Sequence, residues 1–326
     1  MNTPTMHIGI AFDLKPDAPV AADLPDDWVE EFDSPATVQA IAAALRAKGH
    51  ATTELGDGRG LIEKLLADPP DIVFNIAEGI GVGRSREARV PAVCEMLGVP
   101  YTGSDPLSLA AALDKDVARR LVASAGVQIP WGMTPADGAI PEQVPYPAIV
   151  KPAWEGSSKG IRDKCLVHSA DELNAAIDKN RRYHQPVLVE EFIAGDELTV
   201  GVIGNDPPCV LGVMRVIPNR ADGPFVYSLE VKRDFRNLVT YECPARLAPD
   251  ILAAVRTAAL ISYDAIGCRD VARIDFRLRD GVPYFIEANP LPGLNPESSD
   301  LVILGDRVGI SHEQLIGMIV DAARDR

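Results

Sequence analysis

The chain has 326 residues, too many for one small core, and this length predicts two or three domains. Hydrophobic residues make up 47% and charged residues 24%, which is ordinary for a soluble globular protein. Asp and Glu outnumber Lys and Arg by 47 to 32, and the net charge of −15 argues against nucleic acid as a partner, because like charges repel.

Three further features bear on where the protein works. No apolar stretch approaches the ~18 residues that a membrane-spanning helix needs, so we expect no membrane partner. Residues 1–6 form a short polar segment before the first expected strand, so the sequence predicts no signal peptide. The five cysteines are an odd number without a CxxC pair, which is typical of reduced thiols and not of a disulfide framework or a zinc site. Together these features predict a cytoplasmic protein.

The first part of the chain, up to about Ser104, alternates buried strands with helices. We expect strands over 7–12 and 71–76 and helices over 36–48 and 87–97, with a Pro- and Asp-rich loop at 13–31. Ser34 and Pro35 supply the N-cap and first-turn proline of one helix. Strands that alternate with helices predict a parallel sheet.

The remaining chain reads as two further sets of elements. Residues 107–125 are helical, and a Pro-rich link at 127–145 leads to strands over 147–152 and 161–168 and a helix over 170–182. Strand-like runs then follow at hairpin spacing, over 187–192, 198–203 and 210–217. Residues 219–240 have little regular pattern and are expected to form a long functional loop. Helices are expected over 249–265 and 312–324.

Two short apolar runs near the C-terminus, 273–276 and 285–290, carry the clearest chemistry and are joined by a hairpin-type turn. Glu287 and Asn289 are two residues apart and share one face of a strand. Hairpin pairing would bring Asp275 onto that face. Three oxygen donors on one surface suit Mg²⁺ and predict an enzyme that handles phosphate. The alternative is a solvated polar face, against which the apolar flanks argue.

A glycine- and serine-rich loop at 155–160 lies between two expected strands. Its N–H and hydroxyl groups could wrap phosphate oxygens, although it lacks the GK followed by Ser or Thr of a Walker loop. Lys151 precedes it at the end of an apolar run, where a buried lysine needs a counter-charge such as a nucleotide phosphate. Most loops of this composition are simple turns, so the prediction depends on the neighbouring segments.

An apolar strand at 187–193 ends in acidic residues. An adenine ring needs an apolar slot and ribose hydroxyls suit a carboxylate, so Glu197 or Glu190 could bind the ribose. Solvated acids at the end of a strand are the alternative. A lone lysine on a helix is usually exposed, so Lys115, on the helical stretch, is a candidate site residue only in combination with these segments.

In this order, the segments resemble the ATP-grasp superfamily and, within it, the D-alanine–D-alanine ligase family, over nearly the whole chain. The last three of the similar segments form the most specific signature. The similar segments are 101–104 with 112–115, 149–152 with 155–160, 189–192 with 195–197, and 273–276, 287–289 and 291–293.

The resemblance implies an α/β fold with three-domain ATP-grasp architecture. A parallel-sheet N-terminal domain is expected at 1–104, and two α+β domains that clamp ATP are expected at 105–186 and 187–326. Lys115 and Lys151 would hold the phosphates of ATP. The other residues that the resemblance assigns to ATP are Glu155, Ser157, Ser158, Glu190, Glu191, Phe192, Ile193 and Glu197.

Roles beside the reacting groups are implied in the same way. Asp275, Glu287 and Asn289 would bind two Mg²⁺ ions, for which Mn²⁺ could substitute. Arg273 would steady the transferring phosphoryl group, and Lys232 lies in the loop that would close over the γ-phosphate. The expected catalytic residues are Arg273, Ser157, Lys232 and Gly293, and the expected substrate-binding residues are Glu78, Arg233, Arg273, Gly293 and Ser298.

The implied reaction joins two amino acids, D-alanines in the family, to a dipeptide with release of ADP and phosphate. Attack on the γ-phosphate converts a poorly electrophilic carboxylate to an acyl phosphate, which the amine of the second substrate displaces. Metals and cations neutralise the charge on phosphate, and a closed loop protects the acyl phosphate from water. ATP and small-molecule amino acids are the expected partners, and a homodimer is the expected assembly.

The substrate side departs from the family pattern. A longer acidic loop replaces the family's Gly-Ser-Glu segment, so Glu30 and Glu31 are both candidates for the acid that orients the first substrate's amine. Glu78 replaces a usual His, and Arg233 a usual Tyr. We hypothesise that the substrates differ from two D-alanines and that an arginine holds an extra carboxylate on the acceptor. The candidates are Arg84, Arg86 and Arg233, with exposed surface arginines as the alternative.

Three other functions are compatible with parts of this pattern. A related ligase could join a different amino acid or amine, as in specialised metabolism. A dinucleotide-binding oxidoreductase would fit the early alternation of strand and helix, but Gly9 stands alone where a GxGxxG motif is required. A non-catalytic nucleotide-binding protein is disfavoured because Arg273, Asp275, Glu287 and Asn289 are all present.

Overall fold

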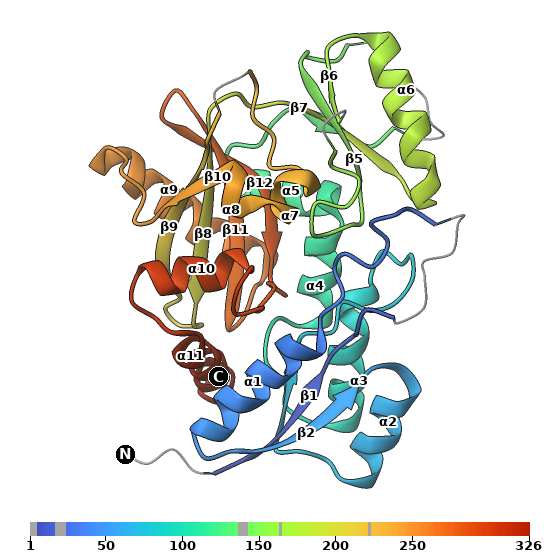
Figure 1. The fold of residues 1–326 in the computed structure, drawn as a ribbon, viewed down its shortest axis with the longest axis vertical. Coiled ribbons are helices and arrows are strands. Elements are labelled where there is room, and N and C mark those ends of the chain that lie inside the picture. Colours follow the sequence, from blue (N-terminus) through green and yellow to red (C-terminus); the bar gives the residue numbers. More distant parts are fainter. Residues whose placement is uncertain (1–4, 17–23, 136–142, 163–164, 221–222) are drawn as a thin grey trace.

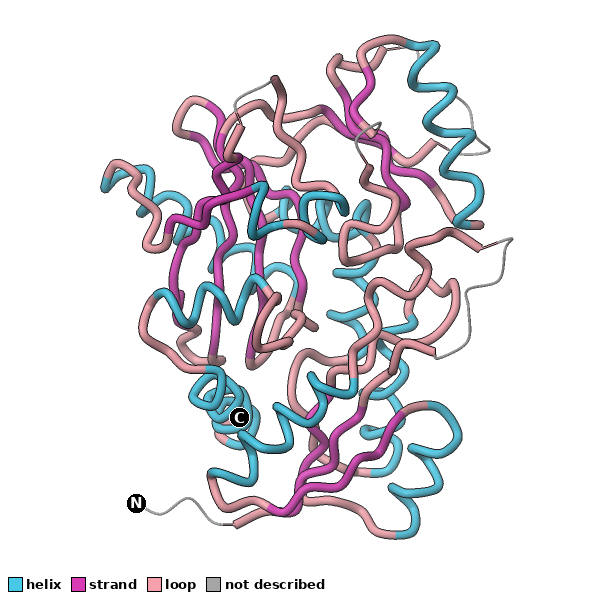
Figure 2. The backbone as a smooth tube through the Cα atoms, viewed as in Figure 1, coloured by secondary structure: helices cyan, strands magenta, loops and turns pink. Residues whose placement is uncertain are grey.

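The computed structural model describes residues 5–16, 24–135, 143–162, 165–220 and 223–326, which fold around three sheets (Figures 1 and 2). The N-terminal sheet lies in the lower part of Figure 1, the second sheet at the upper right, and the largest sheet at the left. The mixed class and the parallel N-terminal sheet confirm the expected fold class. The expected loop at 13–31 and the expected link at 127–145 include residues 17–23 and 136–142, which lie outside the described part.

The N-terminal sheet has the order β2-β1-β3 and is parallel throughout. Ser34 caps the first helix by accepting the Thr37 N–H, as the sequence predicts. Residues 51–67 form an edge strand and a helix that the pattern did not indicate, because only one residue of the strand and two residues of the helix are buried. The elements are β1 (His7–Ala11), α1 (Pro35–Ala47), β2 (Ala51–Gly56), α2 (Gly58–Ala67), β3 (Ile72–Asn75), η1 (Arg86–Ala88) and α3 (Arg89–Leu97).

The helical stretch expected at 107–125 is two helices, α4 (Pro106–Leu113) and α5 (Lys115–Ser124). The break falls at Asp114, whose backbone is extended and whose carboxylate accepts the N–H groups of Asp116 and Val117. A capping carboxylate at this position starts a new helix and leaves Lys115 in its first turn. Both helices pack against the largest sheet rather than the second one.

The second sheet is antiparallel, with the order β4-β7-β5-β6. The strand expected over 161–168 is only a two-residue pairing, and residues 163–164 lie outside the described part. The expected domain boundary at residue 187 falls inside this sheet, because β7 pairs with β5. The elements are β4 (Gly132–Met133), β5 (Ala148–Pro152), β6 (Leu166–Val167), α6 (Ala170–Asn180), η3 (Arg181–Tyr183) and β7 (Val187–Glu191).

The largest sheet is antiparallel, with the order β10-β9-β8-β11-β12. Its buried face, which includes Ile274, Phe276 and Phe285, packs against α5 and α9. The loop expected over 219–240 contains two short helices, one of them capped by Ser228, and residues 221–222 lie outside the described part. The elements are β8 (Asp196–Ile203), β9 (Cys209–Pro218), α7 (Leu229–Arg233), α8 (Phe235–Leu238), β10 (Val239–Glu242), α9 (Pro249–Ile266), β11 (Val271–Arg279) and β12 (Val282–Asn289).

The chain ends with α10 (Asp300–Arg307) and α11 (His312–Arg324). Although α11 follows the largest sheet in sequence, it packs against α1, and both helices share one core with the N-terminal sheet (Figure 1). Burial of this apolar helix face ties the C-terminal end of the chain to its beginning. Within the described residues, every helix is too short or too polar for a membrane crossing.

Candidate active site

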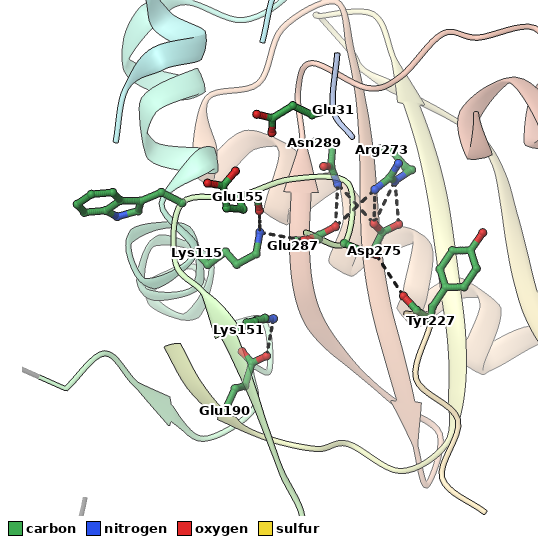
Figure 3. Close-up of polar contacts among 12 residues, drawn as sticks. Glu31, Lys115, Lys151, Glu155, Glu190, Tyr227, Arg273, Asp275, Glu287 and Asn289 are labelled. Carbon is green, nitrogen blue, oxygen red and sulfur yellow. Dashed lines mark hydrogen bonds and ion pairs between the residues drawn. The ribbon is translucent and has the colours of Figure 1, made fainter. Parts of the chain in front are cut away.

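The hairpin of β11 and β12 presents four polar side chains on one face. Arg273 lies opposite Asn289, and Asp275 lies opposite Glu287. Directly opposed residues of an antiparallel pair point to the same side, so the register brings the three expected oxygen donors together (Figure 3). Beyond Asp275 the register shifts by one residue at Ile286, a bulge that returns the following apolar pair to the core.

The three expected metal-binding side chains lie within contact distance of one another and of Arg273. Asn289 Nδ2 lies 3.4 Å from Asp275 and 3.5 Å from Glu287. Arg273 Nη2 lies 2.9 Å from Asp275 Oδ2, and the neighbouring strand supplies Thr199, whose hydroxyl donates to Asp275 over 3.0 Å. The residue types gathered on this face, two carboxylates and an amide, fit the preference of Mg²⁺ for hard oxygen ligands.

A lysine from outside the sheet completes the charge balance. Lys115 Nζ lies 3.2 Å from Glu287 Oε2 and donates over 2.5 Å to the backbone carbonyl of Glu155 (Figure 3). Burial by itself would raise the pKa of Glu287, but the charges of Lys115 and Arg273 outweigh it and hold that pKa below its usual range. Glu287 is therefore ionised and available as a ligand at neutral pH.

Arg273 is held in place by residues that the sequence pattern did not single out. Its Nη1 lies 3.7 Å from Asp300 of α10. The Tyr227 hydroxyl donates to Asp300 over 3.0 Å and lies 2.6 Å from the Tyr241 hydroxyl. These residues are buried but are far apart in the sequence, so no local motif reveals them.

A cavity of about 320 Å³ opens in front of this hairpin, between the N-terminal part, the 155–160 loop and the largest sheet. It gathers most of the residues expected at the reacting end of the site. The expected residues that line it are Glu78, Lys115, Glu155, Ser157, Lys232, Arg233, Arg273, Glu287, Asn289, Gly293 and Ser298.

The loops around this cavity are fixed by local contacts. Ser157 and Ser158 both have positive φ, 49° and 57°, and the Ser158 hydroxyl donates to the Tyr227 carbonyl over 3.2 Å. Lys232 Nζ lies 5.2 Å from the centroid of the Tyr227 ring, and Lys232 lines the cavity. Ser298 donates its hydroxyl to Asn295 over 3.1 Å. Ser157 is therefore part of a shaped loop that faces the cavity.

A buried ion cluster joins the N-terminal part to the 155–160 loop. Arg86, whose side chain is fully buried, lies 2.7 Å from Glu31 and 3.3 Å from Glu155. Lys159 reaches the same two carboxylates over 3.0 and 2.6 Å. Of the two acids that the sequence left open, Glu31 is thus neutralised in the interior, whereas Glu30 pairs with Arg233 over 2.6 Å.

The arginines considered for an extra substrate carboxylate are all paired with carboxylates of the protein. Arg86 and Arg233 have the partners just described, and Arg84 Nε lies 2.6 Å from Asp114. The same cavity wall also contains acids with weaker neutralisation. Burial raises the pKa of Asp33 and of Glu87 to about 7, and burial together with the charge of Glu87 raises the pKa of Glu78. The substrate side is therefore rich in carboxyls, and sequence reasoning did not single out Asp33 or Glu87 among them.

The other residues expected to bind ATP fall into two groups: residues that form ion pairs and residues at a second cavity. Lys151 and Glu190 form a buried pair 2.8 Å apart (Figure 3). Glu191 lies 2.5 Å from Arg279. A second cavity of about 430 Å³ is lined by residues that include Phe192 and Glu197. Ile193, which follows Phe192 in the chain, is buried and does not line this cavity.

The comparisons with known proteins identify the family of this chain. The family model described as D-ala D-ala ligase C-terminus matches residues 132–321. A D-alanine–D-alanine ligase of Cupriavidus necator is 36% identical over 290 residues, covering 87% of this chain and 85% of the relative. The uncharacterised protein y4sG of Sinorhizobium fredii is 34% identical over 297 residues, covering 88% and 87%.

Solved structures show the same fold. The D-alanine–D-alanine ligase from Bacillus anthracis, complexed with ATP, matches with a TM-score of 0.74 and 22% identity over 98% of both chains. The VanG D-Ala:D-Ser ligase from Enterococcus faecalis matches with a TM-score of 0.73 and 22% identity, covering 98% of this chain and 100% of the ligase. The sequence relatives and the family model carry the assignment beyond the fold: this chain belongs to the ATP-grasp D-alanine–D-alanine ligase family.

Proposed function

We propose that this protein is an ATP-dependent carboxylate–amine ligase that joins two D-alanine molecules to D-alanyl-D-alanine, a peptidoglycan precursor, with release of ADP and phosphate. The observation that carries the proposal is the β11–β12 register, which sets Asp275, Glu287, Asn289 and Arg273 on one face beside the cavity. Lys115 is ion-paired to that face. This constellation suits phosphoryl transfer, whose catalysis depends on positioning and charge neutralisation.

Each group has a task that follows from its position. Lys115 and Arg273 would neutralise phosphoryl oxygens together with Lys232, which lines the same cavity. Gly293 lines the cavity, and its N–H would donate to the oxyanion that forms when the amine attacks the acyl phosphate. Asp275, Glu287 and Asn289 would hold Mg²⁺, which when bound supplies further neutralisation of phosphate charge.

Some finer features stay predictions. These are two metal ions with Mn²⁺ as a substitute, the homodimer, and the cytoplasmic location. A ligase for a different amino acid is the second candidate, because the cavity wall formed by Asp33, Glu78 and Glu87 carries more carboxyls than the small neutral side chain of alanine requires. The pairing of Arg84, Arg86 and Arg233 with protein carboxylates argues against an extra carboxylate on the acceptor.

The proposal is tested by phosphate release over a panel of D- and L-amino acids, with mass detection of the product. Asp275→Asn and Glu287→Gln should abolish turnover while the far-UV circular dichroism is unchanged. Each substitution removes a charged magnesium ligand from the face of the β11–β12 hairpin. Asp280→Asn, in the hairpin turn of the same two strands, is the matched control and should retain activity. Normal turnover in either site variant, or tight ATP binding without release of phosphate for any amine, would contradict the proposal.

A further inference from the structure

The second cavity contains an arginine that neither the motifs nor the proposed reaction uses. Arg277 lies on β11, two residues beyond Asp275, and points to the same face of the sheet. With Phe192 and Glu197 it lines the cavity of about 430 Å³. These two neighbours belong to the segment assigned to the nucleotide base and ribose, so Arg277 lies inside the expected nucleotide site.

The guanidinium of Arg277 is almost completely enclosed, with 5% of the residue exposed. Its Nε donates to the Ile193 carbonyl over 2.5 Å, and its Nη2 to the Gly195 carbonyl over 2.9 Å. Its Nη1 donates to Glu197 over 2.6 Å and to the Phe225 carbonyl over 3.1 Å. Four of the five N–H groups of an arginine are thus engaged, and two of them hold carbonyls of the segment between β7 and β8.

Arg277 also lies against the aromatic ring of this segment. Its guanidinium carbon is 4.6 Å from the centroid of Phe192, within the range of a cation–π contact. Phe192 and Arg277 both line the cavity. An aromatic ring in the lining suits contact with the face of a planar base.

Glu197 is left with one free oxygen. Its Oε2 accepts the hydrogen bond from Arg277, while within the part of the chain that the structure describes its Oε1 has no hydrogen-bond partner. Burial raises the pKa of Glu197, and the adjacent Arg277 acts in the opposite direction. The arginine therefore holds a carboxylate in one orientation, with its other oxygen available to a ligand.

The backbone around Arg277 leaves this arrangement little freedom. Gly195 has a φ of +140°, and a Cβ at this position would lie 1.8 Å from the carbonyl oxygen of Leu278. Only glycine permits so close an approach of the segment to β11. The carbonyl acceptors of Arg277 are thus set by the chain path and do not depend on a bound ligand.

We propose that Arg277 is a positioning residue that determines sugar specificity: it orients Glu197 so that Oε1 meets the ribose hydroxyls of ATP, and it closes the base side of the cavity with Phe192. The inference rests on the proposed function, because it takes ATP as the occupant of this cavity. A purely structural arginine would support the fold without changing the preference of the protein among nucleotides.

The test compares the dissociation constants of ATP, 2′-deoxy-ATP and 3′-deoxy-ATP, measured by calorimetry with Mg²⁺ and without amino acid. The wild-type protein should prefer ATP to the deoxy nucleotides by about tenfold, the value of one hydrogen bond to a charged group. Arg277→Met should weaken ATP binding by about tenfold and remove most of this preference. Arg277→Lys should behave like Arg277→Met, because an ammonium cannot make the four directed hydrogen bonds of the guanidinium.

Two further variants separate positioning from stability. Glu197→Gln keeps Arg277 but should lose the same preference, and adding Arg277→Met to it should change the preference little, because the two residues act as a unit. Arg279→Met removes an arginine from the same strand that pairs with Glu191 and Tyr284, and it should leave the preference at the wild-type value. If Arg277→Met does not fold, Glu197→Gln and Arg277→Lys still decide the question.

The outcomes are distinguishable. Loss of the ATP preference in the Arg277 and Glu197 variants, with Arg279→Met unchanged, supports the inference. A wild-type preference in a folded Arg277→Met or Arg277→Lys protein overturns it and leaves the ligase proposal intact. A wild-type protein that binds no ATP overturns the ligase proposal and the inference together.

Discussion

Glu87 shows at the residue scale how burial changes the chemistry of a carboxyl. Its side chain lines the cavity yet is nine-tenths buried, and burial raises its pKa to about 7. The nearby charge of Arg86 acts in the opposite direction and does not fully compensate. The sequence around Glu87 does not predict this raised pKa, because a glutamate at the start of a helix is usually a solvated residue.

The raised pKa of Glu87 has a consequence for stability with a definite sign. The unfolded chain ionises this group near its usual 4.5, whereas the folded protein retains the proton up to about pH 7. The free energy of unfolding therefore falls as pH rises from 4.5 to 7, by an amount on the order of 3 kcal/mol. Glu87→Gln should remove this loss. The free energy of unfolding of the variant should therefore rise relative to that of the wild type between pH 4.5 and pH 8.

Urea unfolding of both proteins at pH 4.5 and pH 8 measures this difference. Glu63→Gln, on the exposed face of α2, is the control. Its free energy of unfolding should differ from that of the wild type by nearly the same amount at both pH values. If Glu87→Gln gave the same offset at pH 4.5 and pH 8, burial would not be suppressing the ionisation of Glu87.

The break between α4 and α5 decides the site at the scale of an element. Asp114 caps α5 with one carboxylate oxygen, while its other oxygen accepts from Arg84 over 2.6 Å and from the Trp154 ring N–H over 2.9 Å. The composition of residues 107–125 predicts helix throughout, and only the cap creates the turn that places Lys115 against Glu287.

Asp114→Ala should therefore reduce both stability and ATP use. Loss of a cap costs about 0.5–2 kcal/mol of unfolding free energy. Displacement of Lys115 should raise KM for ATP by about tenfold, because a charge-assisted contact to phosphate is weakened. Ser169→Ala, which removes the N-cap of α6 away from both cavities, should reduce stability by a similar amount with no change in KM. An unchanged KM in Asp114→Ala would show that Lys115 does not depend on this cap.

At the scale of the whole molecule, the parts are joined by contacts between residues distant in sequence. Arg86 links Glu31, from the N-terminal part, to Glu155 and to the carbonyl of Trp154, the residue that precedes the 155–160 loop. Helix α11 closes the N-terminal core against α1, so the first and last elements share one cluster. The order of elements in the chain is therefore a poor guide to which elements form a cooperative unit.

Arg86→Met should strongly destabilise the protein. The variant leaves Glu31 and Glu155 buried with Lys159 as their shared cation, and removing one partner of a buried pair costs about 3–5 kcal/mol. Thermal unfolding by calorimetry measures the change. Arg59→Met, which removes an exposed pair on α2, should alter the free energy of unfolding by less than about 0.5 kcal/mol. Equal melting temperatures for the two variants would contradict a joining role for Arg86.

The sequence by itself determined the features that depend on local patterns. Alternation of apolar and polar residues placed the hairpin and its metal-type face, the Ser34 cap placed α1, and the ordered motifs placed the ATP side of the site in its family. These features need only neighbours within a few residues, and such neighbours are visible in the chain.

Only the tertiary structure decided which distant charges meet. The pairing of Lys115 with Glu287, the burial of Glu31 with Arg86 and the position of Arg277 beside Glu197 all depend on how separate elements pack. A side chain's sequence neighbours do not fix its burial or its ionic partner, because both are set by elements that arrive from elsewhere in the chain. For that reason the substrate side of the cavity, built from several such elements, was the part least accessible to sequence reasoning.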